Sequence, residues 1–179
     1  LAMTVKGQRY TSAGDTASTV TVEEKNPMRV ALLATGKLAG SGPDGYSYEV
    51  RIHACAGSSL VKVIPTIIKR FGKRRDITQN FDDLSMGLKL ASAKDLTYAL
   101  GGEAAPAAGK LEAGKKASVL VKTSDEWVFG GAASGAGKCK STKPLTLGWG
   151  DLASANGGVA VGVYRFWQVF PKSIEVSGD

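Results

Sequence analysis

Residues that build metal sites and disulfide frameworks are scarce in this sequence. Among 179 residues there is one histidine, His53, and there are two cysteines, Cys55 and Cys139, far apart in the chain. A structural zinc site needs four clustered Cys or His ligands, so the sequence predicts neither a metal site nor a cofactor. One disulfide between the two cysteines, in an extracellular setting, and a pair of free thiols both stay open.

Long apolar runs and helical periodicity are also missing. No run approaches the roughly 20 apolar residues that a transmembrane helix needs, so no membrane partner is expected. What is abundant is glycine, with 23 residues, alongside alanine, serine, threonine and valine. That mixture suits many strands joined by glycine turns. The apolar share of 43% and the charged share of 22% are ordinary for a globular domain and argue against disorder.

Strand-like runs take the place of helices. Val20 and Val22 alternate with threonine and glutamate, which is the pattern of a half-buried strand. Similar runs follow one another at short intervals and predict an antiparallel meander. Pro65 interrupts one of them and marks an edge position or a bulge, because proline cannot donate to a strand ladder. The predicted strands cover residues 17–24, 28–38, 46–56, 60–68, 84–90, 118–122 and 157–168.

The predicted fold is an all-β, antiparallel β-sandwich of the supersandwich type, with long Gly/Ala-rich loops at 101–118 and 130–144. The strand at 157–168 has apolar or small residues on both faces, so we expect a central strand covered on both sides. We expect a single domain over residues 1–179, since a chain of this length buries one core. The chain begins LAMTVKG without an initiator methionine, so we also expect it to be a processed or trimmed product.

The charge balance is basic, with a formal net charge of +7. The one dense cluster is KRFGKRRD, residues 69–76. It is either a solvated hairpin tip or a site for phosphate or an acidic sugar. No zinc-finger spacing, RNP-type aromatic motif or helix-turn-helix accompanies the charge. The sequence therefore favours an acidic polysaccharide over a nucleic acid as the polyanionic partner.

Three stretches resemble the exo-rhamnogalacturonan lyase family: EEKNPMRVALLATGK, YEVRIHACAGSSLVKVIPTI and GWGDLASANGGVAVGVYRFWQVFPKSIEV. The family has similar phrases in the same order, and the likeness spans most of residues 17–179. The last stretch is the most specific, because nine of its residues match with their spacing. These are Trp149, Asp151, Gly157, Gly158, Phe166, Trp167, Gln168, Pro171 and Lys172.

The resemblance implies a central β-sandwich alone, part of, or derived from, a longer multidomain protein. Family members are longer chains that add a barrel-like domain and a helical toroid, and they cleave rhamnose–uronate linkages by β-elimination. This sequence departs from the family at polar positions. Pro65 stands where the family often has histidine, and Tyr164-Arg165 stand where it commonly has Arg-Asp. The resemblance therefore implies a retained fold, whereas an inherited catalytic site is in doubt.

We therefore expect a secreted or cell-surface domain that supports or binds an acidic, rhamnose- and uronate-containing glycan without completing the chemistry. The alternative is an extracellular structural subunit that assembles through its strand edges, and other domains of a longer chain are further partners. Most aromatics of the last stretch are expected in the core, with the polar side chains at its end facing sugar. A buried Arg165 would need a carboxylate partner or an opening into a cleft. The candidate ligand-binding residues are Arg165, Gln168, Lys172, Tyr164 and Trp149, and no catalytic residue is assigned.

Overall fold

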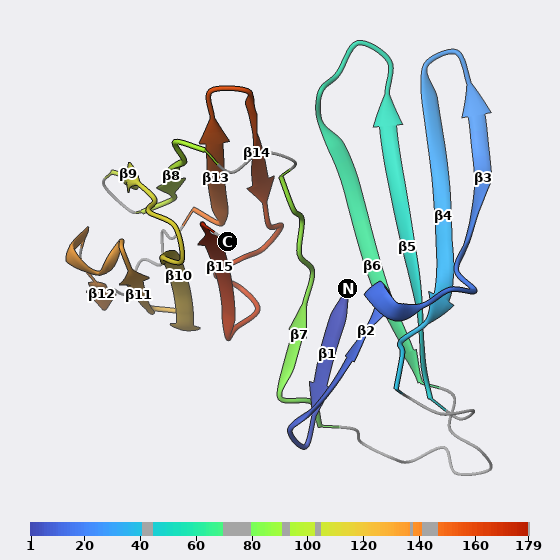
Figure 1. Ribbon diagram of the computed structural model, residues 1–179, viewed down its shortest axis with the longest axis horizontal. Coiled ribbons are helices and arrows are strands. Elements are labelled where there is room, and N and C mark those ends of the chain that lie inside the picture. Colours follow the sequence, from blue (N-terminus) through green and yellow to red (C-terminus); the bar gives the residue numbers. More distant parts are fainter. Residues whose placement is uncertain are drawn as a thin grey trace. The chain divides into compact units, whose positions relative to one another are not determined.

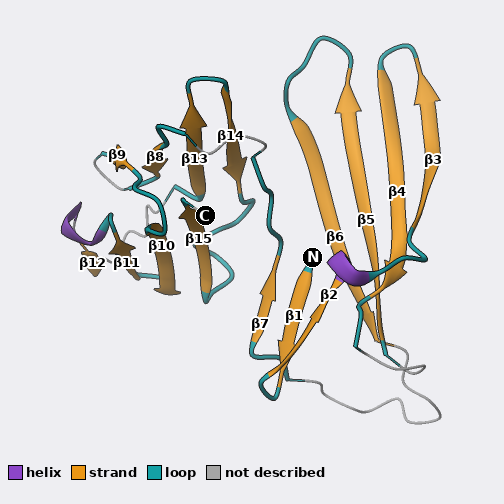
Figure 2. Cartoon of the chain, viewed as in Figure 1, coloured by secondary structure: helices purple, strands orange, loops and turns teal. Residues whose placement is uncertain are grey.

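The fold is all-β. The computed structural model describes residues 1–40, 45–69, 80–90, 94–102, 105–136, 138–140 and 147–178. Within them the regular structure consists of β-strands, apart from two single 3-10 turns, η1 (Ser12–Gly14) and η2 (Ser134–Ala136) (Figure 2). All strand pairs in the described ranges are antiparallel. The predicted all-β, antiparallel architecture is confirmed.

The chain divides into two compact units, Leu1–Leu88 and Lys89–Asp179. Each unit contains two sheets, and each sheet contributes side chains to its own unit's core. The expectation that residues 1–179 make a single domain stays a prediction.

The first unit contains the predicted meander. Its larger sheet has the order β3-β4-β5-β6, and its smaller sheet has the order β2-β1-β7 (Figure 1). Pro65 lies on β6, which is an edge strand of the larger sheet, as the sequence predicts. The strands are β1 (Ala2–Val5), β2 (Gln8–Thr11), β3 (Thr19–Asn26), β4 (Arg29–Lys37), β5 (Tyr46–Cys55), β6 (Val61–Lys69) and β7 (Asp83–Ser85).

The core of this unit lies where the two sheets meet. Tyr46 and Tyr48 alternate along β5 and bury their rings against Met3 and Val5 of β1. Leu38, just beyond β4, is fully buried with them. Burial of such side chains contributes about 1.5–3 kcal/mol each. This cluster therefore holds the small sheet on one end of the large one.

Asp15 ties the loop before β3 to this core. Its carboxylate accepts hydrogen bonds from the backbone N–H of Lys37 at 2.8 Å and of Ala17 at 3.0 Å, and from the Tyr48 hydroxyl at 3.3 Å. Gly36 makes the approach possible, since a Cβ there would collide with Asp15 and Tyr48. The Lys37 and Ala17 N–H groups hold the pKa of Asp15 below its ordinary value of 3.8, against a smaller opposing effect of burial.

The second unit is a two-layer sandwich. One sheet has the order β12-β11-β10-β15 and the other has the order β14-β13-β8-β9. Leu100 from one sheet and Val119 and Val121 from the other share a single core and are almost completely buried. The strands are β8 (Thr97–Leu100), β9 (Ala107–Lys110), β10 (Lys116–Thr123), β11 (Glu126–Gly131), β12 (Lys138–Lys140), β13 (Trp149–Ser154), β14 (Gly157–Gly162) and β15 (Lys172–Ser177).

The predicted strand pattern is wrong in several details, and β1, β2, β8, β11, β13 and β15 lie where no strand was predicted. The strand expected at 157–168 ends at Gly162 and lies at the edge of its sheet, with its glycines exposed. The stretch 84–90 forms only the short β7. The loop expected at 101–118 contains β9, and that expected at 130–144 contains η2 and β12. Small residues misled the assignment, because Gly and Ala pack in strands wherever a neighbouring strand satisfies their backbone.

Replacing Asp15 by asparagine is expected to lower the free energy of unfolding at pH 7. The folded-state pKa of Asp15 lies below its unfolded value, so the charged form stabilises the protein above pH 3.8. That contribution is lost as the pH falls through the folded-state pKa, so the difference between Asp15→Asn and wild type should shrink in acid. Urea denaturation followed by circular dichroism at several pH values measures it. The exposed Asp83→Asn is the control for charge removal, and an equal pH-dependent loss in both variants would contradict the role of Asp15.

Candidate functional site

The candidate site is the turn of residues 163–171, which joins β14 to β15. At its start the backbone N–H of Val163 donates to the carbonyl oxygen of Gly148 at 2.6 Å. Within it the N–H of Gln168 donates to the carbonyl oxygen of Arg165 at 3.2 Å. The chain therefore leaves the sheet at Val163, turns tightly, and returns at Lys172 in the other sheet of the same sandwich.

Phe166 anchors this turn. Its side chain is 2% exposed and belongs to the core of the second unit. Gly148 provides the space, because a Cβ at that position would collide with the Phe166 side chain. Complete burial of a phenylalanine contributes about 3 kcal/mol. The buried ring of Phe166 thus fixes the position of the turn on the sandwich.

The remaining aromatic side chains of the turn are at the surface. Tyr164 is 81% exposed, Phe170 45% and Trp167 38%. The expectation that most of these aromatics are core is therefore wrong, and it holds for Phe166 alone. The physical reason is that the backbone is no longer in a sheet after Val163. Side chains beyond that point do not alternate between two covered faces.

Arg165 has a left-handed backbone, with φ of 53°. A non-glycine residue in this region is strained, and such strain persists only where surrounding contacts enforce it. Here the carbonyl oxygen of Arg165 accepts from the Lys172 ammonium at 3.2 Å as well as from the Gln168 N–H. The guanidinium lies 5.2 Å from the centre of the Tyr164 ring. It is exposed, so it needs neither a buried carboxylate partner nor a cleft.

Four of the five predicted site residues thus lie close together, three on the turn and Lys172 directly after it at the start of β15. Tyr164, Arg165, Gln168 and Lys172 are joined by the contacts just described. Trp149 lies at the start of β13 opposite Gly162, and it is half-buried with its indole against Gly101. Its packing suits a structural role in the sheet. The residues that the sequence reasoning missed are Trp167 and Phe170, and the polar Gln168 next to Trp167 is the signal that could have indicated their exposure.

The chemistry of the turn is that of binding. Aromatic rings, a guanidinium, an ammonium and a carboxamide can together contact a sugar ring and an acidic group. β-Elimination needs a base, a cation for the uronate carboxylate, and an acid for the leaving oxygen. Residues 163–172 contain no carboxylate and no histidine. The turn can therefore hold an anion, whereas residues 163–172 offer no carboxyl group and no imidazole as a general acid or base.

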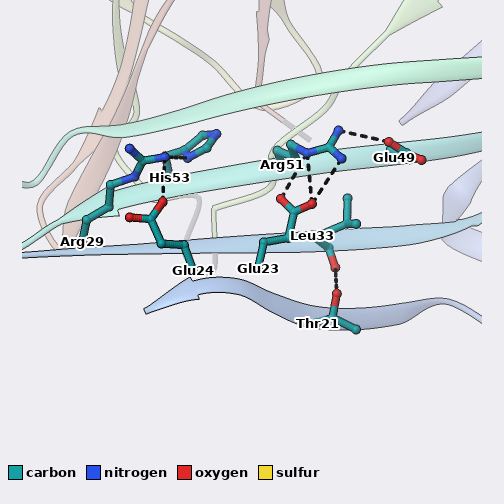
Figure 3. Close-up of polar contacts among 8 residues, drawn as sticks. All are labelled: Thr21, Glu23, Glu24, Arg29, Leu33, Glu49, Arg51 and His53. Atoms are coloured by element: carbon teal, nitrogen blue, oxygen red, sulfur yellow. Dashed lines mark hydrogen bonds and ion pairs between the residues drawn. The ribbon is translucent and has the colours of Figure 1, made fainter. Parts of the chain in front are cut away.

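A second polar array lies on the large sheet of the first unit (Figure 3). A register shift between Val22 and Glu24 adds one residue to β3 and directs Glu23 toward the neighbouring strands. Arg51 on β5 then binds Glu23 at 3.1 Å and Glu49 at 3.0 Å. The hydrogen bonds that Arg51 donates to Glu23 and then to Glu49 raise the pKa of Arg51 above its ordinary value.

His53 belongs to the same array. Its Nδ1 lies 3.0 Å from Nη2 of Arg29, which also contacts Glu24 at 3.2 Å. A guanidinium can only donate, so Nδ1 is the acceptor and the other ring nitrogen carries the hydrogen. His53 lies on the polar face of β5, as the sequence predicts. The charged side chains of this array contact one another, and such surface pairs contribute about 0–1 kcal/mol each. We therefore assign it a structural role.

The structure also bears on metal sites, membrane spans, the two cysteines and the basic cluster. Among the described residues, no three His, Cys, Asp or Glu side chains are grouped to hold a metal ion, and no helix there is long and apolar enough to cross a membrane. Cys55 is free and exposed at the end of β5, and the side chain of Cys139 is outside the described residues. Of the basic cluster at 69–76 only Lys69 is described, and its ammonium lies 4.6 Å from the Tyr46 ring centre.

Comparison with protein-family models finds no matching model, and comparison with curated proteins finds no match.

Phe166→Ala is expected to lower the free energy of unfolding by about 3–5 kcal/mol, because it removes a fully buried ring and leaves a cavity. Trp167→Ala is the matched control, since its ring is partly exposed and its loss should cost about 1 kcal/mol or less. Thermal and urea denaturation of both variants measures the difference. Equal destabilisation by the two substitutions would show that the turn is not anchored through Phe166.

Proposed function

We propose that this chain is a non-catalytic β-sandwich domain that binds an acidic glycan containing rhamnose and uronate. The observation that carries the proposal is the 163–171 turn. It holds a cation in a strained backbone conformation, above a buried anchor and among exposed aromatic rings. Strained backbone positions cluster at active sites and ligand-binding sites, so the strain at Arg165 beside these rings supports a binding role.

Binding would divide among the side chains of the turn by their chemistry. A uronate carboxylate accepts charge-assisted hydrogen bonds from Arg165 and Lys172, each contributing about 1.5–3 kcal/mol. The exposed faces of Trp167 and Phe170 contact the apolar face of a sugar ring. Gln168 offers an amide that both donates to and accepts from sugar hydroxyls. Tyr164 stacks on the Arg165 guanidinium and restricts its orientation.

The charge of the whole chain supports an acidic ligand. A net charge of +7 attracts a polyanion at long range and raises its association rate. This attraction is screened within about 10 Å at 0.1 M salt. Binding to an acidic glycan should therefore weaken as the salt concentration rises. The contribution of contacts with neutral sugar to the binding free energy should not change with salt.

The proposed affiliation is with the polysaccharide lyases, at the level of the central sandwich, and the proposed location is the cell surface or the outside of the cell. The resemblance of the three stretches supports both, and the all-β architecture agrees with the proposed affiliation. The described residues contain no α-helix, whereas the resembled enzymes act through a cleft that a helical toroid helps to form. We therefore propose that this chain by itself binds the glycan and does not cleave it.

Arg165→Gly is expected to weaken glycan binding by about tenfold or more, through loss of one charged contact. Its stability should be equal to or slightly above that of wild type, because glycine relieves the left-handed strain. Lys6→Gly is the matched control, since Lys6 is an exposed cation with φ of 50° in a different turn. Calorimetric titration with rhamnogalacturonan oligosaccharides measures the affinity. Equal weakening by both variants would mean that binding reflects the overall charge of the chain, which would contradict a specific site at Arg165.

A second measurement tests the absence of chemistry. The purified chain is incubated with rhamnogalacturonan and with a glucuronate-bearing glycan, while the ultraviolet absorbance of unsaturated uronate is followed. We expect a flat trace from folded protein, because residues 163–172 include no carboxylate or histidine. A rising trace would mean that the chain carries a complete lyase site. Binding to DNA with the same salt slope and no preference for glycan would contradict the proposed ligand class.

A further inference from the structure

The outer edge of β14 is unlike the other sheet edges that the structure describes. Natural proteins protect edge strands with charges, proline, bulges or short length. β14 has six residues, GGVAVG, with no charged residue, no proline and no register shift against β13. The other described edges are protected as follows: β7 and β12 have three residues, β2 and β9 carry Arg9 and Lys110, β3 has the bulge with Glu23, β6 has Pro65, and β15 carries Lys172 and Glu175.

One hydrogen bond defines which backbone groups of β14 point outward. The N–H of Val163 donates inward, to Gly148 beside β13. Backbone direction alternates along an antiparallel strand, so Val161 and Val159 also point toward β13. Gly158, Ala160 and Gly162 therefore direct their N–H and C=O groups away from the sheet. All three are exposed, and they have the smallest side chains that a strand can carry.

The sequence of this edge is also a palindrome. Residues 158–162 read Gly-Val-Ala-Val-Gly in either direction. An antiparallel pair of identical strands is related by a two-fold axis, which brings each residue opposite its mirror position in the sequence. With the axis at Ala160, glycine meets glycine, alanine meets alanine and valine meets valine. No bulky or charged side chain opposes another.

We propose that β14 pairs with β14 of a second copy of this chain, in antiparallel register about Ala160. Gly158 then pairs with Gly162 of the second copy, and Ala160 with Ala160, each pair exchanging both N–H···O bonds. Val159 and Val161 of the second copy form the close, non-hydrogen-bonded pairs on the opposite face, where valine contacts stabilise a sheet. The result is a continuous sheet that runs β9-β8-β13-β14 through both copies. This inference does not depend on glycan binding.

The strength expected is modest. The contact is one short strand on each side, which buries less than the roughly 1,200 Å² of a standard interface. The backbone groups that pair are hydrated in the monomer, so each bond adds only about 0.5–1.5 kcal/mol before ordering costs. The dimer should therefore form in rapid, concentration-dependent exchange with a monomer of 18.6 kDa.

Sedimentation velocity over a wide concentration series tests the association. The wild-type mass should rise from 18.6 kDa toward twice that value. Ala160→Lys should weaken association by about tenfold or more, because the two introduced cations face each other across the axis. Ala108→Lys is the matched control. Ala108 is an exposed alanine on β9, at the opposite edge of the same sheet. The N–H of Leu111, three residues further on, donates inward to Leu96, so by alternation the backbone groups of Ala108 point outward.

A covalent trap tests the register. In a Cys55→Ser, Cys139→Ser background, Ala160→Cys should form a disulfide-linked dimer under mild oxidation, since paired Cα atoms in this register lie within disulfide range. Ala108→Cys should form it at least about tenfold more slowly. A wild-type mass that stays monomeric together with equal trapping rates overturns the proposal. A mass increase that Ala160→Lys and Ala108→Lys reduce equally overturns the assignment to β14. Glycan binding by the monomeric Ala160→Lys variant is measured separately, so failure of either proposal is recognised without the other.

Discussion

The burial of Phe166 against Gly148 is the contact on which the candidate site depends. The ring enters the core of the second unit, and the glycine leaves it room to do so. This fixes the middle of the 163–171 turn, so the backbone on either side has little freedom to relax. Arg165 is then held in a left-handed conformation, and its carbonyl oxygen is positioned for Lys172 and Gln168. Rigid support below and exposed polar groups above are what a pre-organised binding surface needs.

The two units are stabilised in different ways. The second unit has aliphatic and aromatic side chains from both sheets in one shared core. Among the described residues of the first unit, the small sheet covers one end of the large sheet, around Tyr46 and Tyr48. The rest of that sheet has exposed valines such as Val20 and Val22, and on its other face the ion pairs of Arg51 and Arg29. Backbone pairing along four long strands, rather than side-chain burial, therefore supports that region.

The stretch from Gly157 to Lys172 has two surfaces with separate properties. β14 exposes unprotected backbone groups flanked by glycine and alanine, and the turn that follows exposes aromatic rings and cations. Both surfaces lie next to Phe166, whose ring is buried in the core of the second unit. The cations of the turn suit the proposed acidic ligand, while the uncharged edge of β14 suits the proposed pairing with a second copy. The division between them falls at Val163, whose N–H is the last to bond to the sheet.

The sequence by itself determined the all-β class and the meander within residues 17–68. Val20, Val22 and the alternating residues of 46–56 repeat with the two-residue period that a strand imposes, and this signal is local. It also identified four residues that do meet at the turn and the start of β15, because they lie close together in the chain. Only the tertiary structure decided that β14 is an edge, that Phe166 alone of its aromatic neighbours is buried, and that Trp149 packs on Gly101. Edge position and burial depend on which strands pair across the fold, and small apolar residues suit an edge and a centre equally well, so no local pattern distinguishes them.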